Sequence, residues 1–425
     1  MSALKFRSDE AYARDLDARD PLAGFRDRFH IPLGQDGKPL HYFCGNSLGL
    51  QPKEARSFLE RELEDWRDLA VHGHFRARTP WYSYHEVFRE SGALLVGAQP
   101  GEVVMMNALT VNLHLMMVSF YRPTPERYKI LIEENTFPSD VFAVQSQLRY
   151  HGFDPAEGLM VLKAKDTQEI EEFLEQHGSE IALVMLGGVN YFTGQLFNMA
   201  CITAAAHRQG CVVGFDLAHA AGNVPLSLHD WNVDFAVWCN YKYVNAGPGA
   251  VAGCFVHERH AQQDELPRFA GWWGNDPEQR FVMLSQFEPR HGADGWQISN
   301  PPIFSMAPLR ASLAIFEEAG LTELRKKSEL LTGYLEFLID EITGEPLAIL
   351  TPRQPEARGC QLSIRVHRKP RELLGTLEAH GMVCDFREPD VIRVAPVPLY
   401  NTFHEVWDLA QLLREQCGGQ ENRGR

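Results

Sequence analysis

The sequence predicts an α/β protein with a large domain built on a mostly parallel sheet and a smaller α+β domain. Two observations lead to this fold class. Short apolar runs alternate with helix-like segments through the middle of the chain, a rhythm typical of a parallel sheet covered by helices on both faces. The chain also has 425 residues. A single hydrophobic core stops growing at roughly 250–300 residues, so two domains are expected.

Seven apolar runs of strand length account for the large sheet. They are Val103–Met106, Lys129–Ile132, Met160–Leu162, Ile181–Leu186, Cys211–Phe215, Phe235–Trp238 and Ala250–Val256. The helix-like segments between them are Asn107–Phe120, Ser139–Tyr150, Thr167–Gln176 and Met199–Gln209. Ligands of such sheets bind beyond the carboxyl ends of the strands, so the residues that follow these runs are the expected place for chemistry.

Changes of pattern along the chain give the expected domain limits. Residues 1–40 are polar and rich in Asp and Arg, and we interpret them as an N-terminal arm, part of which packs on the small domain. Residues 41–305 form the large domain, which begins with an amphipathic helix at 54–70. Residues 306–425 form the small domain. It contains helix-like stretches at 309–319, 321–342 and 370–380, and apolar runs at 361–366 and 391–394.

The composition argues against several classes of protein. The chain has 41 Lys and Arg against 56 Asp and Glu, a net charge of −15, which disfavours nucleic acid or anionic lipid as the main partner. No apolar run approaches the roughly 18 residues of a membrane span, and the first ten residues lack the apolar core of a secretion signal. None of the eight cysteines forms a C-x-x-C pair, which predicts reduced thiols in a cytoplasmic protein.

Motifs of other chemistries are missing from the sequence, and no metal site is expected. His72 and His74 lie close together, as do His257 and His260, but neither group has H-E-x-x-H spacing or cysteine companions. The glycines around residue 250 do not satisfy G-x-G-x-x-G, and no Walker A sequence or G-x-S-x-G elbow occurs. Dinucleotide binding, nucleotide triphosphate binding and α/β-hydrolase chemistry are therefore disfavoured.

An acid and a lysine follow two of the apolar runs. Asp216 comes directly after Cys211–Phe215, and Lys242 lies just past Phe235–Trp238, ahead of a glycine-rich turn. A buried carboxylate at a strand end needs a cation. Pyridoxal phosphate requires both residues, because the lysine forms a Schiff base with its aldehyde and the acid keeps its pyridine nitrogen protonated. From these two residues alone, a plain ion pair between them or two unrelated surface charges remain alternatives.

Three further residues fit such a site, and each has a structural alternative. Thr110 lies where a helix opens after a strand, a place where backbone N–H groups and a hydroxyl bind phosphate, but it can also simply cap the helix. Phe137 can stack on a cofactor ring or belong to the core. Arg393 lies within an apolar run of the small domain and needs an anion, either a substrate carboxylate or a structural one.

Taken together, the motifs resemble those of the kynureninase family of pyridoxal-phosphate enzymes, which has the fold-type I (aspartate aminotransferase-like) architecture. The likeness extends over nearly the whole chain. It rests on FCGNSLGLQP (43–52), NALTVNLH (107–114), FPSD (137–140), DLAHAAGN (216–223), NYKYVNAGPG (240–249), GWWG (271–274), QISNPP (297–302) and IRVAPVPLYN (392–401). The acid and the lysine alone indicate only the superfamily, whereas GWWG, ISNPP and RVAPVPLYN together are much more specific.

The resemblance implies a role for each matching residue. Lys242 would carry the Schiff base and shuttle protons, Asp216 would pair with the pyridine nitrogen, and Tyr241 would relay protons. His219 would support Asp216, and Phe137 would stack on the ring. The implied cofactor pocket consists of Leu109, Thr110, Phe137, Pro138, Ser139, Asp140, Thr193, Asp216, His219, Tyr241, Lys242, Trp272 and Asn300.

The resemblance also implies a substrate, a reaction and a partner. Arg393 would bind the substrate carboxylate, and His74 and Asn300 would border its aryl group. The reaction would be hydrolysis of L-kynurenine, or of its 3-hydroxy derivative, to anthranilate, or 3-hydroxyanthranilate, and L-alanine. This reaction cleaves a Cβ–Cγ bond and belongs to tryptophan degradation. A homodimer with shared active sites is expected, in which Trp272 and Asn300 come from the other subunit.

Two other classes of function remain open from the sequence. One is a different fold-type I enzyme, such as a cysteine desulfurase or an aminotransferase. A desulfurase needs a mobile reactive cysteine, and none of the eight cysteines lies in an obvious glycine-rich loop. The other is a cofactor-binding relative without turnover, against which the intact acid, lysine and arginine argue.

Overall fold

The chain divides into two compact units, each with its own hydrophobic core. The computed structural model describes residues 5–164, 166–261, 266–283, 285–343 and 346–418. The larger unit comprises residues 54–191 and 197–317. The smaller unit comprises residues 192–196 with the described parts of 1–53 and 318–425.

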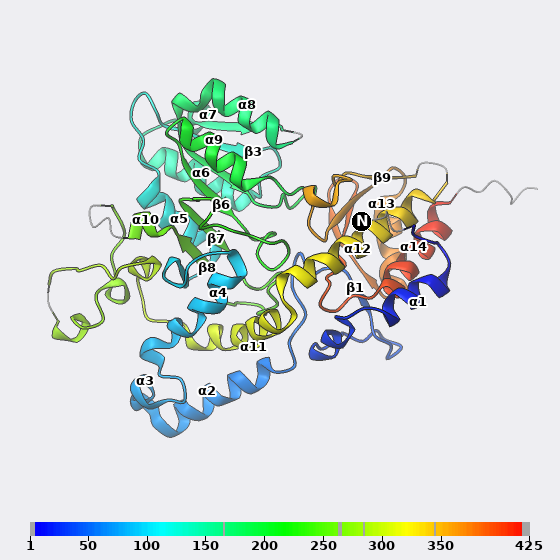
Figure 1. Cartoon of the computed structure of the whole chain (residues 1–425), viewed down its shortest axis with the longest axis horizontal. Coiled ribbons are helices and arrows are strands. Elements are labelled where there is room, and N and C mark those ends of the chain that lie inside the picture. Colours follow the sequence, from blue (N-terminus) through cyan, green and yellow to red (C-terminus); the bar gives the residue numbers. More distant parts are fainter. Residues whose placement is uncertain (1–4, 165, 262–265, 284, 344–345, 419–425) are drawn as a thin grey trace, which may run out of the picture. The chain divides into compact units, whose positions relative to one another are not determined.

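The larger unit contains the predicted seven-stranded sheet, in the order β2-β8-β7-β6-β5-β3-β4 (Figure 1). All neighbouring strands from β7 to β4 pair in parallel, whereas β8 runs antiparallel to both β7 and β2. The prediction of a mostly parallel sheet is therefore confirmed. The strands are β2 (Val103–Met105), β3 (Lys129–Glu133), β4 (Leu159–Leu162), β5 (Ile181–Gly187), β6 (Val212–Asp216), β7 (Phe235–Trp238) and β8 (Gly253–Val256).

Helices connect the parallel strands as predicted, except β6 and β7, which are joined by turns. The strands β2, β3, β5, β6 and β7 run in the same direction, so their carboxyl ends lie at one edge of the sheet. The amino ends of α5 and α6 lie at the same edge. The helices of this unit are α2 (Ala55–Leu69), α3 (Gly73–Arg76), α4 (Arg89–Val96), α5 (Leu109–Phe120), α6 (Pro138–Tyr150), α7 (Pro155–Gly158), α8 (Thr167–His177), α9 (Met199–Arg208), α10 (Glu258–Ala261) and α11 (Ile303–Ala319).

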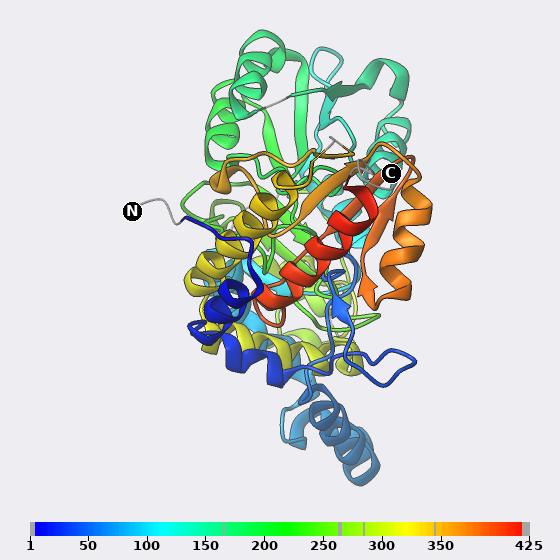
Figure 2. The ribbon, with the colours of Figure 1, turned by 90° about the vertical axis from the view of Figure 1, so that its right-hand side faces the viewer.

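The smaller unit is an α+β structure with a four-stranded antiparallel sheet in the order β12-β13-β10-β9. Helix α14 (red in Figure 2) packs against α12 (gold) and α1 (blue). The carboxylate of Asp17, at the end of α1, accepts hydrogen bonds from the backbone N–H groups of Phe403 and His404 and so satisfies the amino end of α14. The elements are α1 (Glu10–Ala18), β9 (Leu347–Ile349), β10 (Leu362–Val366), α12 (Leu321–Asp340), α13 (Pro370–Ala379), β12 (Asp385–Arg387), β13 (Val391–Val394) and α14 (Phe403–Cys417).

The two compact units divide the chain at positions that differ from the expected limits at 40/41 and 305/306. Residues 41–53 belong to the smaller unit, because β1 (His41–Tyr42) pairs in parallel with β11 (Met382–Val383). The second division, at 317/318, falls near the end of α11, because this helix continues the larger unit almost to its last residue. Part of the N-terminal arm does pack on the smaller unit, through α1.

No helix in the described ranges is long and apolar enough to cross a membrane.

Candidate active site

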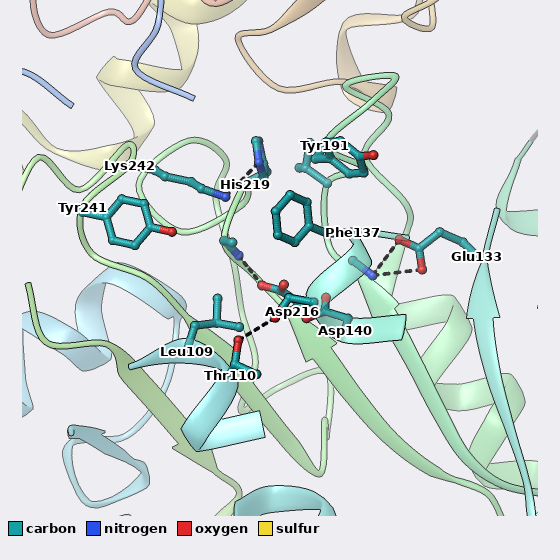
Figure 3. A pocket seen from close by; sticks show the side chains of 14 residues that line it. Leu109, Thr110, Glu133, Phe137, Asp140, Tyr191, Asp216, His219, Tyr241 and Lys242 are labelled. Atoms are coloured by element: carbon teal, nitrogen blue, oxygen red, sulfur yellow. Dashed lines mark hydrogen bonds between the residues drawn. The ribbon is translucent and has the colours of Figure 1, made fainter. Parts of the chain in front are cut away.

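A cavity of about 260 Å³ opens at the carboxyl edge of the large sheet (Figure 3). It lies where the fold brings strand ends and helix starts together, which is the expected ligand position in a sheet of this type. Its lining consists of Leu109, Thr110, Glu133, Phe137, Ser139, Asp140, Gly187, Val189, Tyr191, Asp216, Ala218, His219, Tyr241 and Lys242. Of the residues assigned to the site from the sequence, nine are among these, and Pro138 lies beside them as the first residue of α6.

The Lys242 amine lies in the loop after β7 and faces this cavity. Its Nζ is 3.1 Å from His219 Nε2 and 5.7 Å from the centre of the Phe137 ring. The Phe137 ring in turn meets Tyr191 edge to face, with 5.3 Å between ring centres. The amine is therefore held between an imidazole and an aromatic face, near the cavity wall.

Asp216 is the last residue of β6, beside Gly187 of β5. Its Oδ1 accepts a hydrogen bond of 2.7 Å from the backbone N–H of Ala218, which fixes the orientation of the carboxylate. Within the described residues, no ion pair joins Asp216 to Lys242. The plain ion pair considered as an alternative from the sequence is thus not formed, and both groups remain directed toward the same space.

Two further buried carboxyl groups lie beside Asp216 and make the floor of the cavity acidic. Asp140 is in the first turn of α6, and burial, followed by the charge of Asp216, raises its pKa well above the usual range. Its Oδ1 is buried without a hydrogen-bond partner among the described residues. Glu133 ends β3, and its two oxygens accept from the N–H of Gly187 at 3.1 and 3.2 Å. Burial raises the pKa of Glu133 to about 7.

The neighbouring helix starts supply donors suited to an anion. The Thr110 and Ser139 hydroxyls are 2.8 Å apart, in the first turns of α5 and α6. Neither N-cap residue, Ala108 or Phe137, caps its helix with a side-chain hydrogen bond. Pro138, the first residue of α6, has no N–H, and the N–H of Asp140 donates to the Phe137 carbonyl oxygen. The N–H of Ser139 in α6 and those of Leu109 and Thr110 in α5 are thus the groups suited to a phosphate, which the helix dipoles also favour.

Pyridoxal phosphate fits this donor set. The acidic floor and the partnerless Asp140 oxygen call for a cationic donor, which a protonated pyridine nitrogen provides. The Phe137 ring offers a flat apolar surface, Lys242 offers an amine for the aldehyde, and the paired hydroxyls of Thr110 and Ser139 offer a phosphate subsite.

Three residues assigned to the pocket or its rim lie elsewhere in the larger unit. Trp272 is 48% exposed, and its Nε1 donates to the Arg280 carbonyl. Asn300 lines a second cavity, of about 490 Å³, which Tyr241 also borders. His74 lies in α3 and packs edge to face on Trp81. None of the three lines the cavity that contains Lys242, so one chain does not bring them to it.

The other two predicted residues belong to the smaller unit. Thr193 accepts a hydrogen bond from Thr351 Oγ1 through its carbonyl oxygen. Arg393 is fully buried in β13, where its Nη2 donates to Ser47 Oγ at 3.2 Å and to Asp385 Oδ2. A structural carboxylate therefore meets Arg393, which is one of the two anions considered from the sequence.

The chain is closely similar to proteins of one family along almost its whole length. Kynureninase from Myxococcus xanthus (strain DK1622) is 57% identical over 414 residues, which cover 96% of this chain and 97% of that protein. The chain belongs to the kynureninase family. Kynureninases from Koribacter versatilis (57% over 417 residues, 97% of this chain and 98% of that protein) and Flavobacterium psychrophilum (51% over 419 residues, 96% and 98%) agree. The model of the kynureninase C-terminal domain matches residues 324–413.

Solved structures agree on the fold. The cysteine desulfurase CsdA from Escherichia coli has a TM-score of 0.75 at 16% identity, covering 93% of this chain and 98% of its own. A mutant of C-DES, a cystine C–S lyase, with glycine linked to its PLP cofactor, has a TM-score of 0.74 at 19% identity, covering 88% of this chain and 96% of its own. The predicted fold-type I architecture is therefore confirmed.

Sequence reasoning missed five residues that line this cavity, namely Glu133, Gly187, Val189, Tyr191 and Ala218. Glu133 follows an apolar run directly, just as Asp216 does, so the same rule of an acid at a strand end identifies it. Tyr191 carries no such signal, because its position depends on the path of the loop after β5.

The raised pKa of Glu133 predicts a pH-dependent cost in stability. In the cofactor-free protein, the folded state holds an extra proton between pH 4.5, the ordinary value, and about 7, so rising pH favours unfolding in this window. Glu133→Gln removes this effect. The free energy of unfolding of Glu133→Gln, relative to that of the wild type, should therefore rise by about 3 kcal/mol between pH 4.5 and pH 7.

Urea denaturation at several pH values measures this difference. Glu134→Gln is the matched control, because Glu134 is exposed and should follow the wild-type profile. A difference between Glu133→Gln and wild type that does not change with pH would show that Glu133 titrates normally.

Proposed function

We propose that this protein hydrolyses L-kynurenine, or its 3-hydroxy derivative, to anthranilate, or 3-hydroxyanthranilate, and L-alanine, with pyridoxal phosphate bound in the cavity beside Lys242. The reaction makes it a hydrolase of carbon–carbon bonds in tryptophan degradation. The observation that carries the proposal is 57% identity to kynureninases along nearly the full chain, combined with a lysine amine over an acidic floor. The larger unit is then the cofactor-binding domain.

The chain's own residues suit the binding of this cofactor. When bound, pyridoxal phosphate supplies an aldehyde that joins amines and a protonated ring that accepts electrons from the substrate. Asp216 would hold the proton on the pyridine nitrogen, and Asp140 would support it from α6. Phe137 would lie against the ring. Thr110 and Ser139, with the amino ends of α5 and α6, would hold the phosphate.

Lys242 is the residue proposed to move the protons of the reaction. Its amine would first hold the cofactor aldehyde and, once released by the substrate amine, would take the substrate Cα proton. His219, at 3.1 Å from Nζ, would orient the amine. Tyr241, the neighbour of Lys242 in the chain, would relay a proton, and burial raises the pKa of its hydroxyl, which keeps it a donor at neutral pH.

Arg393 is proposed to bind the substrate α-carboxylate, with His74 and Asn300 at the aryl group. The buried guanidinium is a planar fork of donors, a shape that matches a carboxylate through two parallel hydrogen bonds.

The cysteine desulfurase alternative has only the shared fold in its favour. The similar desulfurase structure is 16% identical, whereas the kynureninases are 51–57% identical over 96–97% of the chain. Alanine production from kynurenine, compared with alanine production from cysteine, separates the two activities directly.

Replacing the proposed Schiff-base residue should abolish turnover. Lys242→Ala should lower kcat for kynurenine by at least about 1,000-fold, because both the cofactor linkage and the proton carrier are lost. Anthranilate fluorescence measures the rate, and circular dichroism checks the fold. Lys163→Ala, which changes an exposed lysine of the same unit, should retain wild-type activity. Wild-type turnover by Lys242→Ala would contradict the assignment.

Arg393→Lys should raise KM for kynurenine by at least about 10-fold, because lysine keeps the charge beside Asp385 but loses the planar fork. The matched control is Arg387→Lys, since Arg387 also pairs with Asp385, at 2.7 and 3.1 Å. Steady-state kinetics on both variants give the comparison. Equal KM values for the two variants and the wild type would remove Arg393 from the substrate site.

We propose a homodimer with shared active sites, because exposed apolar side chains lie next to Trp272, which does not line the cavity of its own chain. We call it the α2–α3 surface. The rings of Trp66 and Phe304 meet at a tilt of 56° with 5.9 Å between centres, and Phe281 lies between Phe75 (6.0 Å) and Trp272 (5.4 Å). All are largely exposed, as are the further members Leu63, Val71, Val282 and Met283. The prediction of an amphipathic helix at 54–70 thus gives a helix whose Leu63 and Trp66 face outward. Exposed apolar groups of this extent mark an interface.

Trp66→Glu should convert the dimer to monomer and reduce activity with it, since Trp272 and Asn300 would no longer reach a partner's site. Light scattering coupled to size exclusion measures the mass. Tyr150→Glu, which places the same charge at a 75% exposed aromatic outside this surface, should leave the dimer intact. A wild-type protein that is monomeric at assay concentration would refute the shared site.

We also place the protein in the cytoplasm, which suits its eight free thiols, six of them buried.

A further inference from the structure

Three side chains able to ligate a metal converge at the edge of the large sheet opposite the candidate active site. Glu102 directly precedes β2, His229 lies in the loop before β7, and His257 directly follows β8, which runs antiparallel to its neighbours. One ligand atom from each lies within 4.8 Å of the other two. No two of these three residues are close in the sequence, so only the fold brings them together.

The carboxylate of Glu102 is buried and held in place from both sides. It is 1% exposed. Its Oε1 accepts from the N–H of Glu258 at 2.8 Å, and its Oε2 accepts from the N–H of Gln99, also at 2.8 Å. These backbone donors orient the carboxylate. Among the described residues, its ion-pair partners are the two histidines, so its charge faces the two imidazoles.

The two imidazole rings stack, with 5.0 Å between centres and 12° between planes. Their Nδ1 atoms face Glu102 Oε1, at 3.0 Å for His229 and 3.7 Å for His257. Their outer nitrogens have partners of their own. His257 Nε2 lies 3.3 Å from the His229 carbonyl oxygen, and His229 Nε2 lies 3.3 Å from the Gln99 amide. At His257, the carbonyl acceptor selects the tautomer whose Nδ1 carries a lone pair. At His229, the amide N–H of Gln99 donates to Nε2, so Nδ1 carries the proton, and an ion would have to displace it.

We propose that Glu102, His229 and His257 bind a divalent transition-metal ion, with Zn²⁺ as the best match. One carboxylate oxygen and two imidazole nitrogens are ligands that zinc accepts, at bonds of about 2.0–2.2 Å. Tetrahedral ligands at that bond length lie roughly 3.3 Å apart. The two separations from Glu102 Oε1, 3.0 and 3.7 Å, are near that value, and the ion would turn the two stacked rings toward each other. His229 is 26% exposed, which leaves an approach for the ion and a water as fourth ligand.

Local hydrogen bonds oppose the ion at both histidines. At His229, the metal replaces the hydrogen bond of 3.0 Å between Nδ1 and Glu102 Oε1. At His257, the metal replaces a bond of 3.2 Å from the N–H of Arg259.

The site joins three segments that are far apart in the sequence, and it does so away from the chemistry. A bound ion would tie the entries of β2 and β7 to the exit of β8, and so stabilise the antiparallel side of the sheet. It would leave the residues that line the Lys242 cavity untouched, because none of them is a ligand. The expected effect is therefore on stability and not on turnover.

The test uses the pyridoxal-phosphate-loaded enzyme, freed of metal with EDTA and titrated with Zn²⁺ by calorimetry. Wild type should bind one ion per chain at this site and should unfold at a higher temperature with Zn²⁺ than without. His229→Gln should weaken that binding by at least about 100-fold, more than the loss of an outer partner costs, and should abolish the thermal shift. Kynurenine turnover should stay at the wild-type rate.

His367→Gln is the matched control, because His367 is an exposed histidine of the smaller unit, and it should bind like the wild type. His257→Gln provides a second, independent ligand variant, and retained turnover shows that either variant has folded. Co²⁺ absorption bands of a tetrahedral N/O site should appear in wild type and vanish in both ligand variants. A wild type that binds no Zn²⁺, or ligand variants that bind it as tightly as the control, would overturn the proposal.

Discussion

The burial of three carboxyl groups at the carboxyl edge of the sheet is the constraint on which the candidate site depends. β3, α6 and β6 bring Glu133, Asp140 and Asp216 together, and the pKa values of the first two rise, chiefly through burial. Ionising such a cluster is costly unless a cationic group faces it. A protonated pyridine nitrogen is such a group. The acidic floor thus favours the protonated form of the pyridine ring, whereas the phosphate of the same cofactor suits the helix starts at Thr110 and Ser139.

The sheet and four residues of the cavity, Thr110, Phe137, Asp216 and Lys242, could be predicted because their signals are local, whereas the other predicted lining residues came from the resemblance to the kynureninase family. Apolar runs of strand length with helices between them give the topology, and an acid at the end of a run gives Asp216. Features that depend on pairing between distant segments could not be predicted. The first boundary between the units differs from the expected one because β1 pairs with β11, some 340 residues away in the sequence. Asp385 faces Arg393 only through the antiparallel register of β12 and β13, which nothing near Arg393 in the sequence indicates.

The α2–α3 surface and the proposed metal site also depend on contacts between distant segments. The helical spacing of its residues predicts the apolar face of α2. It does not predict that this face points outward, with Trp66 58% exposed, because that depends on the burial of Glu62 and Asp65 on the other side of the helix. The Glu102, His229 and His257 group likewise cannot be predicted from spacing, because three segments far apart in the sequence supply one ligand each. The large sheet thus has one edge suited to cofactor chemistry and an opposite edge suited to a structural ion.

The central claim is a covalent bond between the Lys242 amine and the cofactor aldehyde. Borohydride reduction of the loaded enzyme, followed by protease digestion and peptide mass mapping, tests it most directly. The account predicts a pyridoxyl-phosphate adduct on the peptide that contains Lys242, in an amount equal to the bound cofactor. An unmodified Lys242 peptide from fully loaded enzyme, or an adduct on a different lysine, would contradict it.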